Sequence, residues 1–377
     1  MKKVAIIGAG ISGLFIANLF SKDPDYQVTI FEKNNSISNE DGYGIQLSVN
    51  SIKILNEIGF DKLDEKEKFN PTKIDFYSNK SLNKICELKI SDFNFENCKY
   101  TTLKRSVLIN FLKKNLEKSI KTNHSISKID EQSNSIQIYF ENNKTFYCDH
   151  LIISDGVFSK SKNLISNNKN KAKYNDTLAI RGIISQVPDS FNNKNISLFL
   201  GSNFHYVIYP VNSSGDLNFI AIIKYKLSLI EQKNYSLTND HSFFEKILKK
   251  NPLTLKQVLN KIKGAKLFPI FVSKDFYLLK NNNIHLIGDA FFAFPPSFAQ
   301  GASQSIEGAY ELYKSIKNNT EDEFLINRIK KIKAVNNRSK FNQFIFHLSN
   351  PFFVFFRNIL LKRLVKNKKF LESYLGK

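Results

Sequence analysis

The sequence predicts an α/β fold in which two lobes interleave along the chain and a helical tail follows them. Three observations lead to this prediction. An apolar strand, a glycine-rich turn, a helix and a second apolar strand occupy residues 3–31, which is the order of a βαβ unit. Long runs rich in strand-forming residues fill about 177–226, and the chain from Glu321 onward is helical and basic.

The first lobe is expected to contain a parallel sheet, because its strands are short apolar runs that suit burial on both faces. A proline-containing turn should join the last of these strands to a helix over 302–316. Gly59 should end an earlier helix. The remaining expected strands are 3–7, 28–31, 150–153 and 284–287, and the remaining helices are 12–20, 49–58 and 106–116.

The second lobe is expected to hold a mixed or antiparallel sheet. Its strands alternate in polarity at 73–77 and 84–90, and longer runs follow at 178–185, 204–209 and 217–223. No repeat or low-complexity linker separates the lobes. We therefore expect the first lobe to comprise 1–72, 101–165 and 275–320, the second 73–100 and 166–274, and a C-terminal helical segment 321–377.

The composition excludes several classes of protein. The formal charge is +21, but lysines are scattered through every segment, so we expect solvated lysines and no nucleic-acid surface. Cys86, Cys98 and Cys148 have neither disulfide-framework nor metal-site spacing, so no metal is expected and a reducing cytoplasm fits. The apolar N-terminus lacks a signal-peptide cleavage site, and no stretch suits a transmembrane helix.

A GxGxxG motif follows the first strand. Gly8 permits a tight turn, Gly10 lets the backbone approach a pyrophosphate, and Gly13 lets the helix pack closely on the strand. Glu32 ends the second strand, where it can accept hydrogen bonds from a ribose. The sequence therefore predicts a dinucleotide site. Its predicted residues here are Gly8, Gly10, Ile11, Ser12, Gly13, Glu32 and Lys33.

Two further motifs follow apolar strands: Asp155-Gly156 and Gly288-Asp289. In order and spacing, the three motifs resemble those of the flavoprotein aromatic hydroxylases of the para-hydroxybenzoate hydroxylase fold, over residues 3 to about 312. The resemblance implies a Rossmann-type FAD-binding lobe. It also implies that the GxGxxG motif binds the ADP half of FAD and that Asp155 and Gly156 lie where FAD and the nicotinamide cofactor pass. Asp289 would hold the ribityl chain and the pyrophosphate.

Smaller matches extend the resemblance. Residues 42–50, with Gly44, resemble the family's glycine loop beside the isoalloxazine ring, and Arg105 stands where the family keeps an arginine that contacts FAD. A simple turn and a solvated helix-start charge are the alternatives. Residues 295–302 resemble the proline loop that lies against the flavin, and the helix start there would stabilise negative charge on the reduced ring. The FAD-binding residues implied by this loop are Pro296, Gly301 and Ala302.

Three positions depart from the family pattern. Lys162 stands where arginine is usual, which removes a bidentate fork but keeps the charge. Phe292 replaces a histidine, and Gly308 replaces an aspartate. These departures leave the handling of the nicotinamide open.

Residues 179–182, 205–210 and 217–219 resemble the salicylate and 3-hydroxybenzoate hydroxylase branch. His205 and Tyr209 are four apart in a strand, so they share a face and are predicted to line a substrate pocket. A histidine with a pKa near neutrality could accept a phenolic proton, which makes both residues candidate catalytic groups. The alternative is a core histidine beside a core tyrosine.

The activity that the resemblance implies is hydroxylation of a small phenolic or carboxylated aromatic substrate. NADH or NADPH would reduce FAD, and O2 would then form a flavin C4a-hydroperoxide that transfers oxygen. The single GxGxxG motif argues against a disulfide reductase with two nucleotide domains. A monomer and a homodimer are both compatible with the sequence.

Two other functions stay open. One is hydroxylation of a polyprenylated quinone precursor at the membrane surface, supported by the aromatic and then basic segment 351–366. A helix docked on the protein with snorkelling lysines is the interpretation of that segment that we favour. The other is a flavin-dependent redox sensor or regulator.

Overall fold

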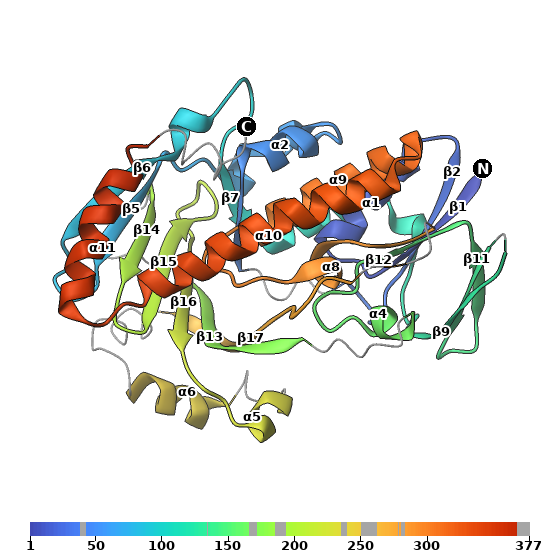
Figure 1. The fold of residues 1–377 in the computed structure, drawn as a ribbon. Coiled ribbons are helices and arrows are strands. Elements are labelled where there is room, and N and C mark those ends of the chain that lie inside the picture. The colour runs from blue at the N-terminus through green and yellow to red at the C-terminus, as the bar shows by residue number, and fades with distance from the viewer. Residues whose placement is uncertain are drawn as a thin grey trace.

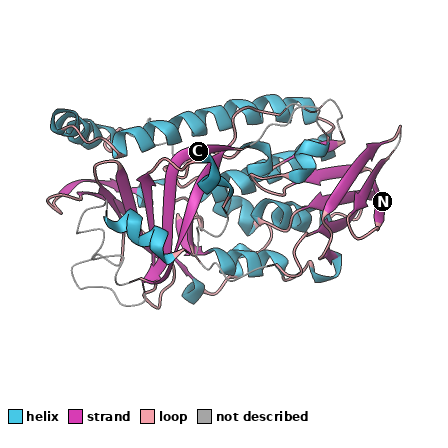
Figure 2. Cartoon of the chain, turned by 90° about the horizontal axis from the view of Figure 1, so that it is seen from below, coloured by secondary structure: helices cyan, strands magenta, loops and turns pink. Residues whose placement is uncertain are grey.

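The computed structural model describes residues 1–37, 43–133, 135–165, 172–184, 194–234, 240–249, 262–277, 279 and 283–367. Gly42 of the predicted glycine loop, Ser185 of a predicted strand and 368–377 of the predicted tail lie outside the described residues. Figure 1 shows an elongated molecule with strands at both ends, joined along one side by the long helix α10 (Glu321–Phe346). In Figure 2 helices fill the space between the two groups of strands.

One end of the molecule is a five-stranded parallel sheet in the order β18-β12-β1-β2-β8. Segments far apart in sequence meet here because β12, β18 and the last four residues of β1 are apolar enough to be buried on both faces. The predicted parallel sheet is confirmed. Its strands are β1 (Lys2–Ile7), β2 (Tyr26–Phe31), β8 (Ile120–Lys121), β12 (His150–Ile153) and β18 (Ile284–Leu286).

Helices cover this sheet. The first, α1 (Ile11–Ser21), is buried over most of its length and packs against α9. Gly59, with φ of +94°, follows α2 at the predicted helix stop. The other helices of this region are α2 (Val49–Asn56), α3 (Arg105–Lys113), α4 (Lys160–Leu164), α8 (Gly288–Phe292) and α9 (Gly301–Asn318), with short 3-10 turns at Phe60–Lys62, Glu65–Glu67, Ile90–Phe93 and Glu117–Ser119.

The other end is a seven-stranded sheet in the order β17-β13-β16-β15-β14-β5-β6, antiparallel except between β14 and β5. The predicted mixed sheet is confirmed. Its strands are β5 (Lys73–Ser78), β6 (Lys84–Lys89), β13 (Lys173–Ile184), β14 (Ile196–Leu200), β15 (Phe204–Pro210), β16 (Leu217–Lys224) and β17 (Lys263–Val272). Helices α5 (Leu229–Lys233) and α6 (His241–Lys249) follow β16.

The sequence prediction missed several strands, including β8 and β14. The edge strand β17 contains Pro269, which an edge position tolerates but which disguises a strand pattern. An antiparallel meander also escaped notice: β9 (Ile126–Glu131), β10 (Ile136–Phe140) and β11 (Thr145–Cys148).

A small antiparallel sheet joins the two ends. It has the order β3-β7-β4, from β3 (Gly44–Leu47), β4 (Lys68–Phe69) and β7 (Thr101–Lys104). The Thr102 hydroxyl donates to the Pro210 carbonyl at 2.6 Å, and the Gly44 amide donates to Asn218 Oδ1 at 2.6 Å. These contacts attach β7 and β3 to β15 and β16, and thus fix the large sheet relative to the parallel sheet.

The predicted helical tail forms α10 and α11 (Pro351–Leu364). α11 packs on β6, the outermost strand of the seven-stranded sheet. Among the described helices, none has the length and apolarity needed to cross a bilayer.

Candidate functional site

A cavity of about 520 Å³ opens at the carboxyl ends of β1, β2 and β12. In parallel α/β sheets this edge is where ligands bind. Seven of the predicted site residues line it, together with parts of the β9 meander. The seven are Gly8, Gly10, Glu32, Lys33, Arg105, Asp155 and Gly156. We call this cavity the groove.

The three motif glycines have different local roles. Gly8 has φ of +100°, and a Cβ there would lie 2.7 Å from the Ser154 carbonyl oxygen. At Gly13 a Cβ would lie 2.1 Å from the Gly8 carbonyl oxygen, so this position in the first turn of α1 requires a residue without a side chain. At Gly10 a Cβ would meet no atom within 4 Å, because that position faces the open groove. Gly8 and Gly13 thus serve packing, whereas Gly10 leaves room for a ligand.

The acidic end of β2 closes one side of the groove. Glu32 accepts hydrogen bonds from the backbone amides of Ala9 and Asn34, both at 3.0 Å, so its carboxylate is already oriented beside the glycine turn. Lys33 is exposed on the rim. A hydroxyl-bearing ligand in the groove would meet this carboxylate, as predicted for a ribose.

Asp155 and Gly156 lie on the wall opposite β2. The Asp155 carboxylate accepts from the Ser161 amide at 3.1 Å through Oδ2, whereas its buried Oδ1 has no partner within the described residues. An unpaired buried acceptor beside a cavity is suited to a ligand donor. Nearby Lys162 is buried, which lowers its pKa, while the charge of Asp155 opposes that shift.

The Gly288-Asp289 motif lies against the start of α1. Gly288 has φ of +59°, and a Cβ there would lie 2.6 Å from the hydroxyl of Ser12, which is buried at this contact. Neighbouring protein atoms displace water around the Asp289 carboxyl and raise its pKa, and the positive charge of Arg105 opposes the shift. Asp289 and Arg105 therefore lie close enough for their charges to interact, beyond the glycine turn.

A second cavity, of about 110 Å³, lies between the seven-stranded sheet and the predicted proline loop. Pro296 and His205 line it, as do side chains from the end of α10. Its walls are apolar apart from a few polar groups. The lining residues are Gln46, Ile74, Phe76, Leu88, Tyr100, Ile196, Leu198, His205, Val207, Pro296, Ser297, Phe298, Ala299, Gln300, Asn342 and Phe346. We call it the apolar cavity.

His205 is buried in the wall of the apolar cavity, and its Nδ1 lies 2.9 Å from Nε2 of His347 at the end of α10. Burial and the neighbouring His347 lower the pKa of His205 well below its ordinary value. A pKa lowered in this way does not meet the near-neutral condition under which His205 could act as a base, because the side chain is buried. A neutral imidazole in this place accepts or donates a hydrogen bond but is a weak base.

Tyr209 lies on the same face of β15 as His205, but it is not among the residues that line the apolar cavity. It packs in the core behind Gln46, whose amide contacts its hydroxyl, and burial raises its pKa. Gln46 also accepts a hydrogen bond from the Tyr100 hydroxyl at 2.8 Å. Tyr209 is therefore linked to the cavity only indirectly, through the Gln46 side chain that lines it.

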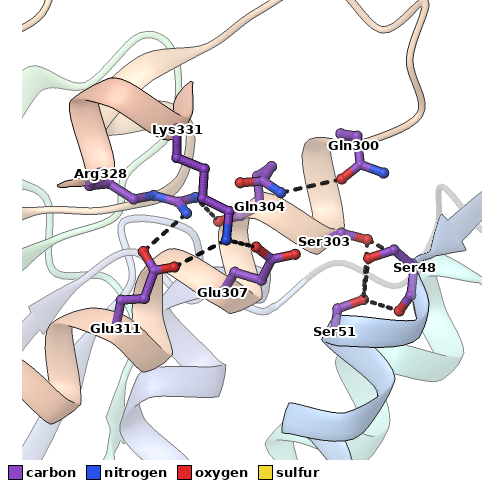
Figure 3. A network of polar contacts seen from close by, with 9 residues as sticks. All are labelled: Ser48, Ser51, Gln300, Ser303, Gln304, Glu307, Glu311, Arg328 and Lys331. Atoms are coloured by element: carbon purple, nitrogen blue, oxygen red, sulfur yellow. Dashed lines mark hydrogen bonds and ion pairs between the residues drawn. The ribbon is translucent and has the colours of Figure 1, made fainter. Parts of the chain in front are cut away.

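Polar contacts hold the start of α9 from two sides, as Figure 3 shows, and a further contact from α10 holds the proline loop that precedes it. From α2, the Ser51 hydroxyl donates to Ser303 Oγ at 3.1 Å, and the Ser48 amide donates to the same oxygen at 2.9 Å. From α10, Asn342 donates to the Ser297 carbonyl at 3.2 Å, and Arg328 donates to the Gln304 carbonyl. The loop is therefore anchored to α10 and, through the start of α9, to α2, where it lines the apolar cavity.

Ser12, Gly13, Asp289 and Tyr209 do not line either cavity, and neither do four further predicted site residues. Gly44 is buried beneath Asn218, where a Cβ would lie 2.6 Å from the Asn218 Cβ. Ile11 and Ala302 are half-buried and pack against the core, and Gly301 is exposed at the first position of α9. Their predicted contacts with a cofactor stay predictions.

The departures at Gly308 and Phe292 have structural explanations. A Cβ at Gly308 would lie 2.8 Å from Nε of the buried Arg328, so the arginine fills the space that a larger residue would need. Phe292 is buried and stacks on Phe276 with a centroid distance of 4.3 Å. Each departure is therefore matched by a neighbour: Arg328 of α10 packs over Gly308, and Phe276 packs on Phe292.

Tyr100, Asn342 and His347 were missed by the sequence interpretation. Tyr100 and Asn342 line the apolar cavity, and His347 contacts its histidine. No motif surrounds them, and two of the three come from α10, which the sequence showed only as a basic helical tail. Only the fold brings them to this place.

The fold and the groove define a nucleotide-binding α/β protein, with its glycine turn at the edge of a parallel sheet and a second sheet beside it. The comparison with protein families is more specific. The chain belongs to the FAD binding domain family, whose model matches residues 1–323.

Individual relatives are distant. The chloroplastic zeaxanthin epoxidase of Prunus armeniaca is 23% identical over 332 residues, covering 82% of this chain and 48% of that protein. Salicylate hydroxylase of Pseudomonas putida is 21% identical over 337 residues, covering 82% and 75%. The chain thus spans about half the length of the zeaxanthin epoxidases that it matches. The fold matches Klebsiella pneumoniae HpxO, solved with FAD and uric acid, with a TM-score of 0.85, 16% identity and coverage of 100% and 98%.

The residues of the groove fit FAD, the cofactor of this family. Gly10 leaves open space where a pyrophosphate would pass, Glu32 presents a carboxylate to a ribose, and Asp155 Oδ1 is an acceptor without a partner. Arg105 supplies positive charge on the same wall, near Asp289. The predicted cofactor is therefore consistent with both the family and the local chemistry.

Proposed function

We propose that the chain is an FAD-dependent monooxygenase that uses NADH or NADPH and O2 to hydroxylate a small aromatic substrate. The observation that carries the proposal is the apolar cavity, which adjoins the clamped proline loop and has few polar groups. Its volume of about 110 Å³ is of the order of the ~150 Å³ cavity that binds benzene in another protein. A single ring is the substrate size that these walls favour.

Bound FAD would supply the redox and oxygen-transfer chemistry. The groove residues Gly10, Glu32 and Asp155 would bind its adenosine and phosphate portion. The proline loop would then position the reactive end beside the apolar cavity, because Pro296 lines that cavity and α10 holds the loop. The apolar walls would exclude water from the reacting atoms.

His205 would orient the substrate's hydroxyl. Its depressed pKa keeps the imidazole neutral across the physiological range, so one ring nitrogen can accept a hydrogen bond from a phenol. Partial loss of the phenolic proton to this acceptor raises electron density on the ring and favours electrophilic oxygen transfer. His347 would fix the orientation of the His205 ring, and Tyr209 would act as a positioning residue through Gln46.

Relatives support a phenolic substrate. One relative is named salicylate hydroxylase, and another, 24% identical over 225 residues, is named 3-amino-4-hydroxybenzoate 2-monooxygenase. A panel of single-ring phenolic acids, purines and quinone precursors tests the proposal. Simple phenolic acids should stimulate oxidation of NADH or NADPH and yield a product one oxygen heavier by mass spectrometry. A protein that binds no FAD, or that oxidises neither nucleotide with any aromatic compound, would refute it.

The hydroxylation of a polyprenylated quinone precursor remains the second candidate. The observation that favours it is the exposed aromatic surface of α11, which packs on β6, the strand that contributes Leu88 to the apolar cavity. Stimulation by prenylated phenols above single-ring acids in the same panel would select this function.

A further inference from the structure

Helix α11 has two unlike faces. Arg357 and Leu361 are buried against the body of the protein, on which the helix docks through β6. This agrees with the docked helix that we favoured from the sequence. The opposite face, however, is uncovered, and Figure 1 shows α11 at the outer end of the molecule beyond β5 and β6. The exposed apolar side chains are Phe352, Phe353, Phe355, Phe356, Ile359 and Leu360.

The four phenylalanines form one continuous cluster, which we call the phenylalanine face. Phe352 lies 4.8 Å from Phe356 and 5.7 Å from Phe353 between ring centroids, and Phe355 lies 5.6 Å from Phe356. Each is between 51% and 64% exposed. Contiguous exposed apolar surface of this kind marks an interaction site, because leaving it in water is costly.

The charges on α11 itself are all positive. The segment 347–367 contains no Asp or Glu, and exposed Lys362, Arg363 and Lys366 follow the aromatic residues on the last turns of α11. The side chains therefore divide along the helix axis into an aromatic half and a cationic half. Snorkelling lysines alone do not account for this arrangement, since they leave the aromatic rings uncovered.

The partner must be both apolar and anionic. A second copy of the chain that paired through this face would cover the phenylalanines but would offer no anionic group to the cationic half, because a two-fold interface uses the same surface twice and 347–367 contains no Asp or Glu. An anionic bilayer surface offers acyl chains to phenylalanines and negative headgroups to lysine and arginine. The overall charge of +21 adds long-range attraction to such a surface.

We propose that α11 docks the protein on anionic membranes, with the helix lying in the plane of the surface. The phenylalanine face enters the boundary between headgroups and acyl chains, and Lys362, Arg363 and Lys366 contact the headgroups. A helix of 14 residues extends about 21 Å, which is too short to cross the ~30 Å hydrocarbon core. The proposed docking of α11 is independent of whether the substrate is a single-ring phenol or a prenylated quinone precursor.

Vesicle flotation of the full-length, FAD-loaded protein tests the proposal. The wild type should float with mixed phosphatidylcholine and phosphatidylglycerol vesicles and should remain behind with phosphatidylcholine alone. Phe352→Glu/Phe356→Glu should lower the bound fraction by at least ~10-fold per phenylalanine, given the burial free energy of such a side chain. Lys362→Glu/Arg363→Glu should weaken binding to anionic vesicles and leave the flavin content unchanged.

The matched control is Leu229→Glu/Ile230→Glu on α5, where two apolar residues are 76% and 83% exposed. This variant introduces the same charge change elsewhere and should float like the wild type. Flavin absorbance in each variant verifies that the fold is intact. The proposal is wrong if wild-type protein does not float, or if the phenylalanine variant floats equally well. It is also wrong if the wild type is a dimer that the phenylalanine variant dissociates, because the face is then a contact between copies.

Discussion

The groove and the apolar cavity are built in different ways. The groove is formed by backbone turns at the ends of neighbouring parallel strands, and most of its wall comes from short motifs in which glycines set the geometry. The apolar cavity is formed by side chains from β5, β6, β14, β15, the proline loop and α10, which are scattered from residue 46 to residue 346. A site made by backbone geometry leaves a local signature in the sequence, whereas a site made by side-chain volume does not.

The strongest test of this contrast uses two glycines of one motif. At Gly13 an added Cβ would lie 2.1 Å from a backbone oxygen that cannot move without breaking the turn, so Gly13→Ala should prevent formation of the FAD lobe. The loss of stability should exceed the ~1–3 kcal/mol usual for overpacking. Measurements of yield, circular dichroism and thermal unfolding without added FAD would detect it.

The control for that variant is Gly10→Val, in which the side chain points into the open groove. This protein should fold with unchanged thermal stability in the absence of FAD but should fail to take up the cofactor. Equal stability of the two variants would show that backbone geometry does not separate packing from binding in this motif.

The sequence predicted seven residues of the groove wall because backbone turns with required glycines form that wall. Gly8, Gly13 and Gly288 are required by close approaches of 2.1 to 2.7 Å, which no other residue type could make. Strand periodicity located the ends at which Glu32 and Asp155 emerge. Gly44 is hydrogen-bonded to Asn218 at the junction of two sheets, and its predicted place beside the flavin stays a prediction.

The second prediction concerns the histidine of the apolar cavity. His205→Ala removes the proposed acceptor for the substrate's hydroxyl and should slow hydroxylation by about 10² to 10⁴. FAD content should be unchanged, because His205 lies outside the groove wall. Reduction of the flavin by NADH or NADPH should suffer less than product formation, with more hydrogen peroxide released per nucleotide oxidised.

His347→Gln is the companion variant, because a glutamine amide can still hydrogen-bond to His205 Nδ1. It should retain more coupled product formation than His205→Ala. Full coupling in His205→Ala would assign this histidine to the core, which is the alternative that the sequence left open.

The cavity shows where sequence reasoning fails. Strand geometry predicted that His205 and Tyr209 share a face of β15. It did not predict that only His205 lines the cavity, because Tyr209 contacts Gln46, which does line the cavity and also hydrogen-bonds to Tyr100. The pKa of His205 depends on its burial in β15 and on His347 at the end of α10, which is 142 residues further along the chain. His347 had no sequence signal, since its importance arises only where α10 ends against β15.

The smallest expected effect is a dependence of stability on pH that originates in the same histidine pair. Burial and the charge of Lys224 lower the pKa of His347 to about 4, and the pKa of His205 is also well below its ordinary value of about 6.5. Below pH ~6.5 the unfolded chain therefore binds more protons at these histidines than the native state, so the free energy of unfolding should fall as the pH drops from 6.5 towards 4. Each such group adds at most ~1.4 kcal/mol per pH unit to that slope.

Urea unfolding across this range should give a shallower slope for His347→Gln than for the wild type, and a shallower slope still for His205→Gln/His347→Gln. Parallel slopes in all three proteins would mean that the pair is hydrated enough to be protonated in the folded state, and the account of His205 as a neutral hydrogen-bond acceptor would then be wrong.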